Sequence, residues 1–129
     1  MSSSEATTRG VRVEVDARYS EEHSAPQLNR WFFLYTIRIT NEGSETVQLI
    51  SRHWIIADAT QAQEEVRGPG VVGEQPVLGP GEHFEYTSGC PLSTPFGSME
   101  GTYQMVTSDG DHFDANIERF LLMEPSSIN

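Results

Sequence analysis

Apolar and polar residues alternate along much of this chain, and the alternation restricts its fold more than any other feature of the sequence. Val11, Val13 and Val15 alternate with charged residues, a pattern typical of a strand that buries one face. Segment 30–40 is rich in the aromatic and β-branched residues that favour strands. Because no segment carries convincing helical periodicity, we expect a chain built from strands.

About seven strands are predicted, separated by turn-forming segments. They are expected at residues 11–16, 30–40, 46–59, 63–66, 82–88, 98–107 and 112–123. Segment 46–59 is long for one strand, so a kink or bulge is expected near 51–53. The last strand loses its apolar parity between Ile117 and Phe120, which indicates another bulge. Strands at this spacing without helices predict an all-β, antiparallel β-sandwich.

Two turn signals predict hairpins. Residues 41–45 separate two β-rich runs, and residues 108–111 contain an Asp-Gly pair. Trp31 and Trp54 lie in the two strongest strands and are interpreted as core aromatics.

The length of 129 residues suits one domain, which we expect at 10–125 between flexible tails at 1–9 and 126–129. The first residues lack the apolar core of a signal peptide, and no apolar run is long enough to span a bilayer. The single cysteine, Cys90, excludes an internal disulfide and indicates a reducing compartment. These observations predict a cytoplasmic protein without membrane insertion.

The net charge of −11 restricts the class of partner. Nineteen acidic residues oppose eight basic ones, all of them arginine, so the surface repels nucleic-acid backbones and anionic membranes. No nucleic-acid partner is therefore expected, while the oligomeric state is not indicated.

Gly68, Gly70 and Gly73 fit the spacing Gly-x-Gly-x-x-Gly of dinucleotide-binding turns. Such a turn must open a helix, but two prolines and two glycines occupy the next eight residues, and Pro69 removes an N–H. The phosphate-loop pattern fails because the chain contains no lysine. We interpret 67–81 as a connection between strands and a candidate binding loop. Binding of pyrophosphate or a nucleotide at these glycines is the alternative.

Four segments resemble the bacterial ApaG family. They are Ser51-Arg-His-Trp-Ile-Ile-Ala-Asp58, Val66-Arg-Gly-Pro-Gly-Val-Val-Gly-Glu-Gln-Pro76, Pro80-Gly-Glu-His-Phe-Glu-Tyr-Thr-Ser-Gly-Cys-Pro-Leu92 and Thr94-Pro-Phe-Gly-Ser-Met-Glu-Gly-Thr-Tyr-Gln-Met105. The resemblance extends over nearly the whole chain past its first ten residues. It implies an immunoglobulin-like sandwich of the fibronectin type III kind, in agreement with the predicted strands.

The resemblance also limits the expected function. ApaG-like domains of eukaryotic F-box proteins and of a polymerase-delta-interacting protein look like protein-interaction modules. Bacterial members are commonly labelled as cobalt and magnesium efflux proteins, a label that rests on a phenotype. The family has no established catalytic residues, so none is assigned, and no cofactor is expected.

Potential metal ligands are densest in one short segment, consisting of Asp109, Asp111, His112 and Asp114. The calcium-loop pattern fails there because Phe113 occupies a ligand position. We interpret the cluster as a solvated hairpin tip. A divalent-cation sensor linked to the efflux phenotype is a second alternative, whereas transport requires a segment that crosses a bilayer.

A protein-interaction module is the leading functional hypothesis. Cys90 has no recognisable catalytic signature around it and is interpreted as a half-buried thiol. The candidate surfaces are the loops 67–81 and 89–97 and any exposed sheet edge. Arg67 and Phe96 are the candidate contacts, since arginine and aromatic residues often dominate binding energy at interfaces.

Overall fold

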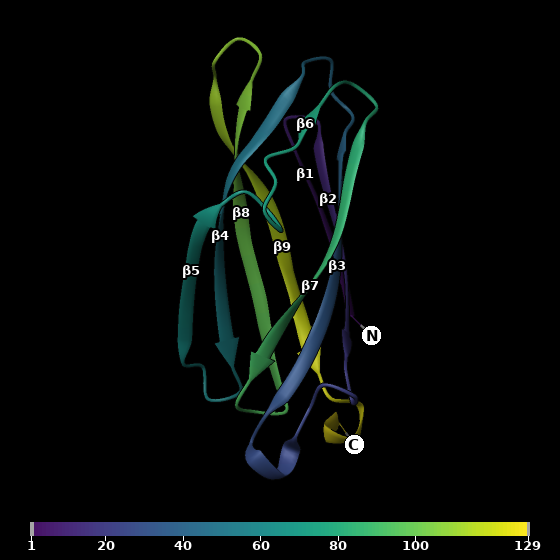
Figure 1. The fold of residues 1–129 in the computed structure, drawn as a ribbon, viewed down its shortest axis with the longest axis vertical. Coiled ribbons are helices and arrows are strands. Elements are labelled where there is room, and N and C mark those ends of the chain that lie inside the picture. The colour runs from purple at the N-terminus through teal and green to yellow at the C-terminus, as the bar shows by residue number, and fades with distance from the viewer. Residues whose placement is uncertain (1, 129) are drawn as a thin grey trace.

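Two antiparallel sheets pack face to face as a β-sandwich in the computed structural model, which describes residues 2–128 (Figure 1). One sheet has the order β1 (Ser2–Thr8), β2 (Val11–Tyr19), β3 (Trp31–Asn41) and β7 (His83–Leu92). The other has the order β5 (Gln63–Pro69), β4 (Val47–Asp58), β8 (Phe96–Thr107) and β9 (His112–Met123), and β6 (Val77–Leu78) also pairs with β4. Short 3-10 turns form η1 (Pro26–Leu28) and η2 (Pro125–Ile128).

The predicted antiparallel sandwich is confirmed, and each of the seven expected strands is present, with β1 and β6 in addition. The core lies between the sheets, where one side chain in two from each strand points inward. Its largest fully buried side chains include Tyr103, Phe33 and Phe120. Trp54 is a core residue as predicted, while Trp31 is half-buried and packs against the edge of the core.

Both predicted bulges are found. In β4 the register against β8 shifts at Ile50, one residue before the expected range. In β9 the shift falls between Ile117 and Phe120, as the loss of parity predicted. A bulge returns the following apolar residues to the inner face, so each strand keeps its core contacts along its whole length.

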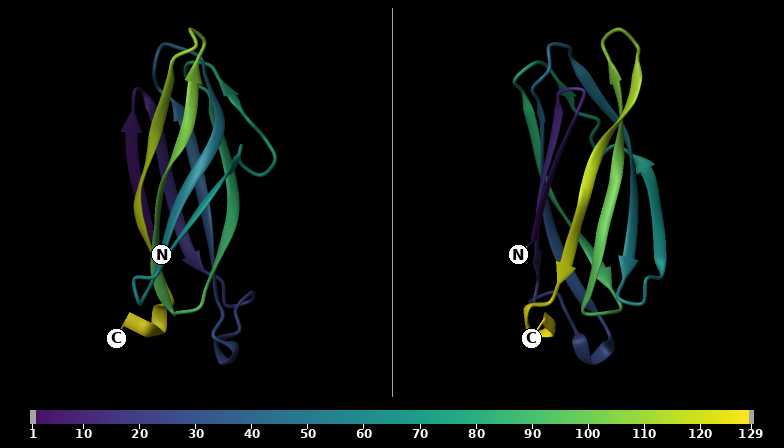
Figure 2. Two further views of the ribbon diagram at one scale, coloured as in Figure 1. Left: turned by 90° about the vertical axis from the view of Figure 1, so that its left-hand side faces the viewer. Right: turned by 180° about the vertical axis from the view of Figure 1, so that it is seen from behind.

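The prediction of a flexible N-terminal tail is wrong for Ser2–Thr8, which forms β1 and pairs with β2 along its whole length. Ser4 Oγ also donates to the Glu118 carbonyl at 2.7 Å, and Asn116 N–H donates to Thr8 Oγ1 at 3.0 Å, so β1 joins the two sheets (Figure 2). Its residues are mostly small and polar, and backbone pairing rather than an apolar pattern holds it.

The C-terminal tail expected at 126–129 also differs from the structure, because Pro125–Ile128 forms η2. Residues 1 and 129, at the ends of the two expected tails, lie outside the described residues.

The hairpin predicted at 41–45 is wrong, because β3 and β4 belong to different sheets. The segment instead crosses between sheets. Asn41 is buried there, and its amide donates to the carbonyls of Glu45 at 2.7 Å and Leu78 at 2.9 Å. Turn-forming residues mark a reversal of the chain but do not specify which strand it will pair with.

The loop predicted at 89–97 is mostly strand, since β7 extends to Leu92 and β8 begins at Phe96. Pro91 is tolerated because β7 is an edge strand, where a missing N–H leaves no ladder bond unmade. In the same way β5 extends through Pro69 and includes Arg67 and Gly68, which the sequence placed in a loop.

The sandwich is closed on one side and open on the other. β1 and β9 lie side by side and close the first side (Figure 2), whereas the edge strands β5 and β7 stay apart on the second (Figure 1). Among the described residues no helix has the length and apolar character that crossing a membrane requires.

Candidate functional site

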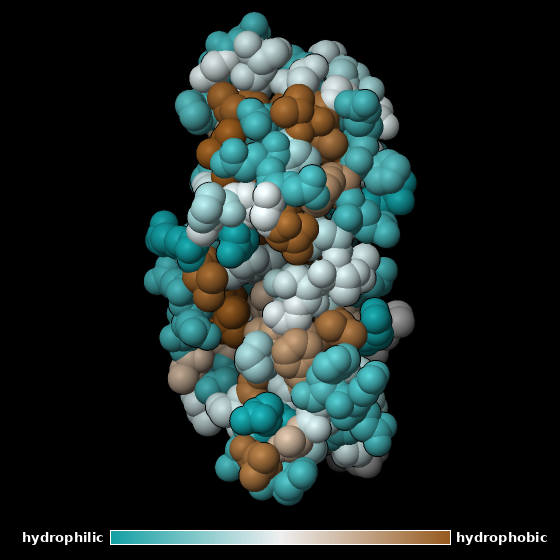
Figure 3. All heavy atoms as spheres, viewed as in Figure 1, coloured by the Kyte–Doolittle hydropathy of each residue, from teal (hydrophilic) through white to brown (hydrophobic). Residues whose placement is uncertain are grey.

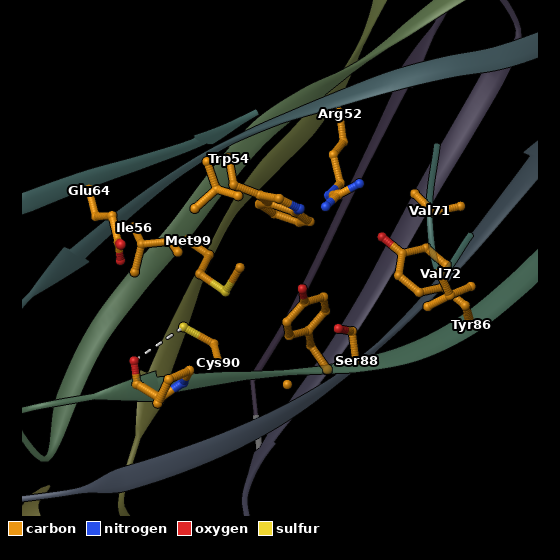
Figure 4. A pocket seen from close by; sticks show the side chains of 14 residues that line it. Arg52, Trp54, Ile56, Glu64, Val71, Val72, Tyr86, Ser88, Cys90 and Met99 are labelled. Carbon is orange, nitrogen blue, oxygen red and sulfur yellow. Dashed lines mark hydrogen bonds between the residues drawn. The ribbon is translucent and has the colours of Figure 1, made fainter. Parts of the chain in front are cut away.

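A pocket of about 450 Å³ opens between the sheets on the side where β5 and β7 stay apart. We call it the inter-sheet pocket. Figure 4 shows Arg52 and Trp54 projecting into it from β4, and Ser88 and Cys90 from β7. On this side of the molecule hydrophobic residues form separate patches among hydrophilic ones (Figure 3). The residues that line the pocket combine an apolar wall with a few polar groups. This is the usual composition of a ligand site.

Strand periodicity assigns the residues of β4 to two surfaces. Arg52, Trp54 and Ile56 line the pocket, while His53 and Ile55 face outward. The bulge at Ile50 precedes this stretch and sets its parity. An arginine therefore occupies an inward position in series with core residues.

Arg52 is half-buried and held by the chain itself. Its Nη1 donates to the carbonyls of Pro69 at 3.0 Å and Gly70 at 2.9 Å. The guanidinium lies over Gly68, where a Cβ atom would be 3.0 Å from Nη2. Gly68 therefore leaves space for the arginine and is a packing requirement of the pocket.

The bulge in β4 also anchors the glycine-rich loop. The Ile50 carbonyl accepts hydrogen bonds from the Gly70 N–H at 2.8 Å and from the Gln75 amide at 2.9 Å. Val71 is thereby held 1% exposed at the end of the pocket. The next residue, Val72, is 57% exposed at the pocket margin with φ of 43°, an unusual conformation for a β-branched residue.

Each glycine of the Gly-x-Gly-x-x-Gly spacing has a local structural role. Gly70 and Gly73 have φ of 60° and 82°, and Gly73 follows Val72 in a tight turn closed by hydrogen bonds between Val71 and Glu74. The N–H groups of Gly70, Val71 and Glu74 all donate to carbonyls of the chain. They are not free to cradle a phosphate, so the geometry does not favour the nucleotide alternative.

We expect Gly70→Ala to lower the free energy of unfolding by about 2–5 kcal/mol, and Gly73→Ala by only about 1–2 kcal/mol. Both substitutions place a side chain at positive φ, but only at Gly70 would the new Cβ collide with the Glu74 carbonyl oxygen. Urea unfolding followed by circular dichroism measures both losses. Equal losses would contradict the structural role given to Gly70.

Burial keeps the thiol and the two phenol groups that line the pocket protonated. It raises the pKa of Cys90 to about 12, and it also raises the pKa values of Tyr35 and Tyr86. For both tyrosines the charge of Arg52 acts in the opposite direction with a smaller effect. At neutral pH the pocket thus presents hydroxyl donors, one cation and a thiol that is a poor nucleophile.

The outer face of the β5–β4–β8–β9 sheet carries the two candidate contact residues. Phe96 and Leu121, each 44% exposed, lie with Ile55 around a depression that Arg119 borders. Arg67 lies farther along the same face, opposite His53 in the β4–β5 pairing. The structure therefore places Arg67 and Phe96 on one continuous face.

His53 and Arg67 share one carboxylate on this face. His53 Nε2 is 2.7 Å from Glu65 Oε1, and Arg67 Nη2 is 3.4 Å from the same atom. His53 is therefore a hydrogen-bonded strand residue on this face.

The four potential metal ligands are not brought together. In the described part of the chain, no group of three or more His, Cys, Asp or Glu residues is placed to hold a metal ion. Asp109 and Asp111 are exposed at the β8–β9 turn, whereas His112 and Asp114 lie in β9, where the extended backbone spreads them apart. The carboxylate oxygen Oδ2 of Asp111 lies 4.0 Å from Nη2 of Arg9.

The pocket was not predicted from the sequence, and Arg52, Tyr35 and Ser88 were not candidates. One signal was present: Arg52 keeps the same parity along its strand as Trp54 and Ile56. An arginine in series with core residues must either be paired or line a cavity.

Comparison with known proteins identifies the family. The family model of the ApaG domain matches residues 21–107. The chain belongs to the ApaG family. Protein ApaG of Methylobacterium sp. strain 4-46 is 60% identical over 120 residues, which cover 93% of this chain and 92% of that protein. Protein ApaG of Anaeromyxobacter dehalogenans strain 2CP-C is 54% identical over 126 residues, covering 98% and 99% respectively.

A solved structure agrees with this membership. The crystal structure of a Bordetella pertussis protein described as ApaA has a TM-score of 0.87 and 55% sequence identity. The match covers 89% of this chain and 94% of the Bordetella chain. The resemblance to ApaG inferred from four sequence segments is thus confirmed over most of the chain.

Proposed function

We propose that this ApaG chain is a non-enzymatic protein-interaction module, and that it binds its partner through the outer face of the β5–β4–β8–β9 sheet. One observation carries the proposal: Phe96 and Leu121 are large apolar side chains exposed together on this face, with Arg119 beside them and Arg67 on the same face. An aromatic residue near arginines is the usual composition of an interface hot spot.

Charge selects the partner. With 19 acidic residues against 8 arginines, the chain attracts a basic surface and repels an acidic one. The matching partner presents an apolar residue that fits beside Phe96, with basic groups that face Asp58 and Glu100 in the lining of the same depression. Association is then expected to slow as the ionic strength rises, since salt screens long-range attraction.

Phe96→Ala is expected to weaken partner binding by about thirtyfold or more, the effect of losing a hot-spot side chain. Arg67→Ala is expected to weaken it less, because 72% of that side chain is exposed. Partner capture from the source cell, followed by titration of the captured protein, measures both effects.

The matched control is Leu28→Ala. Leu28 is 64% exposed on η1, outside this face, so its replacement should leave binding unchanged. If Phe96→Ala and Arg67→Ala both left capture unchanged, or if Leu28→Ala reduced it equally, the proposed surface would be wrong.

A further inference from the structure

The inter-sheet pocket contains an arginine, Arg52, that forms no ion pair among the described residues. Arg9, Arg12, Arg38 and Arg67 each lie within 4.0 Å of a carboxylate. Among the described residues no carboxylate lies that close to the other four arginines, Arg18, Arg30, Arg52 and Arg119, although the chain carries 19 acidic residues. Of these four, only Arg52 is half-buried, whereas the other three are exposed. A half-buried arginine without a counter-ion, in an acidic protein, indicates a place for an external anion.

The geometry of Arg52 leaves half of its guanidinium available. Only Nη1 donates to acceptors within the described residues, namely the carbonyls of Pro69 and Gly70. These two bonds hold the group in place over Gly68 and leave the Nε–H and Nη2–H pair for another acceptor. That pair matches the two oxygens of a carboxylate.

The rest of the pocket suits an apolar body attached to the anion. Trp54, Ile56, Val66 and Met99 contribute apolar wall on the β4–β5–β8 side, and Figure 4 shows Ser88 and Cys90 on the facing strand. The volume of about 450 Å³ lies in the range of small-molecule sites. The occupant therefore has a compact apolar group and one anionic end.

The charge of the pocket selects the kind of anion. Arg52 is the single cationic residue in its lining, and Glu64 is the one Asp or Glu residue there. A doubly charged phosphate would keep one charge that Arg52 does not balance, next to an acidic residue, whereas the single charge of a carboxylate is balanced by Arg52.

We propose that the inter-sheet pocket binds a small organic monocarboxylate, with its carboxylate on Arg52 and its apolar body between Trp54 and the β7 strand. This site is separate from the proposed protein-binding face, because Arg52 and Trp54 point inward while Ile55 points outward from the same strand. The two proposals can therefore fail independently.

The test titrates the full chain with 3-phenylpropionate and follows backbone amide NMR signals. Saturable shifts are expected at pocket residues of β4, β5 and β7. The uncharged 3-phenylpropionamide should bind about ten- to a hundredfold more weakly, the range expected on losing a charged hydrogen-bonded pair. Arg52→Gln should weaken the acid by the same factor, since glutamine can still donate to the loop carbonyls but carries no charge.

Two further variants distinguish the loss of the pocket site from a general effect of substitution on the protein. Arg67→Gln removes an arginine from the opposite face of the same strand pair and should leave affinity unchanged. Val66→Phe fills the pocket from the edge strand, keeps Arg52 and should abolish binding.

The proposal would be overturned by equal binding of the acid and its amide, by unchanged affinity in a folded Arg52→Gln variant, or by shifts that are absent or spread over the whole protein. Tighter binding of phenyl phosphate than of 3-phenylpropionate would also overturn it, by assigning the pocket to phosphate.

Discussion

Replacing Trp54 by alanine is expected to lower the free energy of unfolding by about 3–5 kcal/mol, the usual cost of removing a buried tryptophan. Trp54 is 3% exposed, and its ring packs against Tyr35 at 5.5 Å, Phe120 at 6.0 Å and Tyr103 at 6.4 Å between centroids. The side chain thus joins residues of both sheets, and its loss leaves a cavity under the inter-sheet pocket. Since a domain of this kind is stable by about 5–15 kcal/mol, the effect is a large share of the total.

Trp31→Ala is the matched control. Trp31 is half-buried at the edge of the core, so its replacement should lower the free energy of unfolding by distinctly less. Urea unfolding at neutral pH, followed by far-ultraviolet circular dichroism, measures both variants. Trp54→Phe supplies an intermediate value if the alanine variant does not fold. Equal losses at the two tryptophans would contradict the packing described.

Alkaline pH is expected to destabilise the protein steeply. Burial raises the pKa of Cys90 from its ordinary 9.0 to about 12, and raises those of Tyr35, Tyr86 and Tyr103 above their ordinary 10.0. Between the ordinary and the raised pKa values, the unfolded chain has lost protons that the folded chain keeps. Stability is therefore fully present below about pH 9 and falls as the pH rises.

Each of these groups removes about 1.4 kcal/mol of stability per pH unit above its ordinary pKa. The free energy of unfolding, measured in urea at intervals from pH 7 to 11, should fall with a slope that steepens above pH 10. In Cys90→Ala the slope should be shallower by the contribution of one group, about 1.4 kcal/mol per pH unit. A free energy of unfolding that stays constant to pH 11 would contradict the burial of these groups.

The strands were predictable because their signal is local. The alternation at Val11–Val15 and the aromatic run in β3 appear within a few residues of sequence, and so does the loss of parity between Ile117 and Phe120. β1 was missed for the same reason: Ser2–Thr8 has no apolar alternation, and its partners are the edge of β2 and residues of β9 more than a hundred positions away.

The candidate sites likewise divide into those predicted from local sequence and those that depend on contacts between distant residues. Arg67 and Phe96 were predicted from residue type, and the structure places them on one face of one sheet. The glycine spacing left pyrophosphate or nucleotide binding as an alternative. In the structure Gly68 makes room for Arg52 and Gly70 for the Glu74 carbonyl, two contacts that a spacing pattern does not contain.

Residue types and their periodicity are sufficient to specify strands, turns, an acidic surface and membership of the ApaG family. Each of these depends only on neighbouring residues or on the overall composition. The partner of each strand, the closure of one side by β1 and β9, and the pocket around Arg52 depend on contacts between distant segments. Such contacts form only when two sheets pack against each other, since burial of the shared core selects one pairing from the several that local patterns allow.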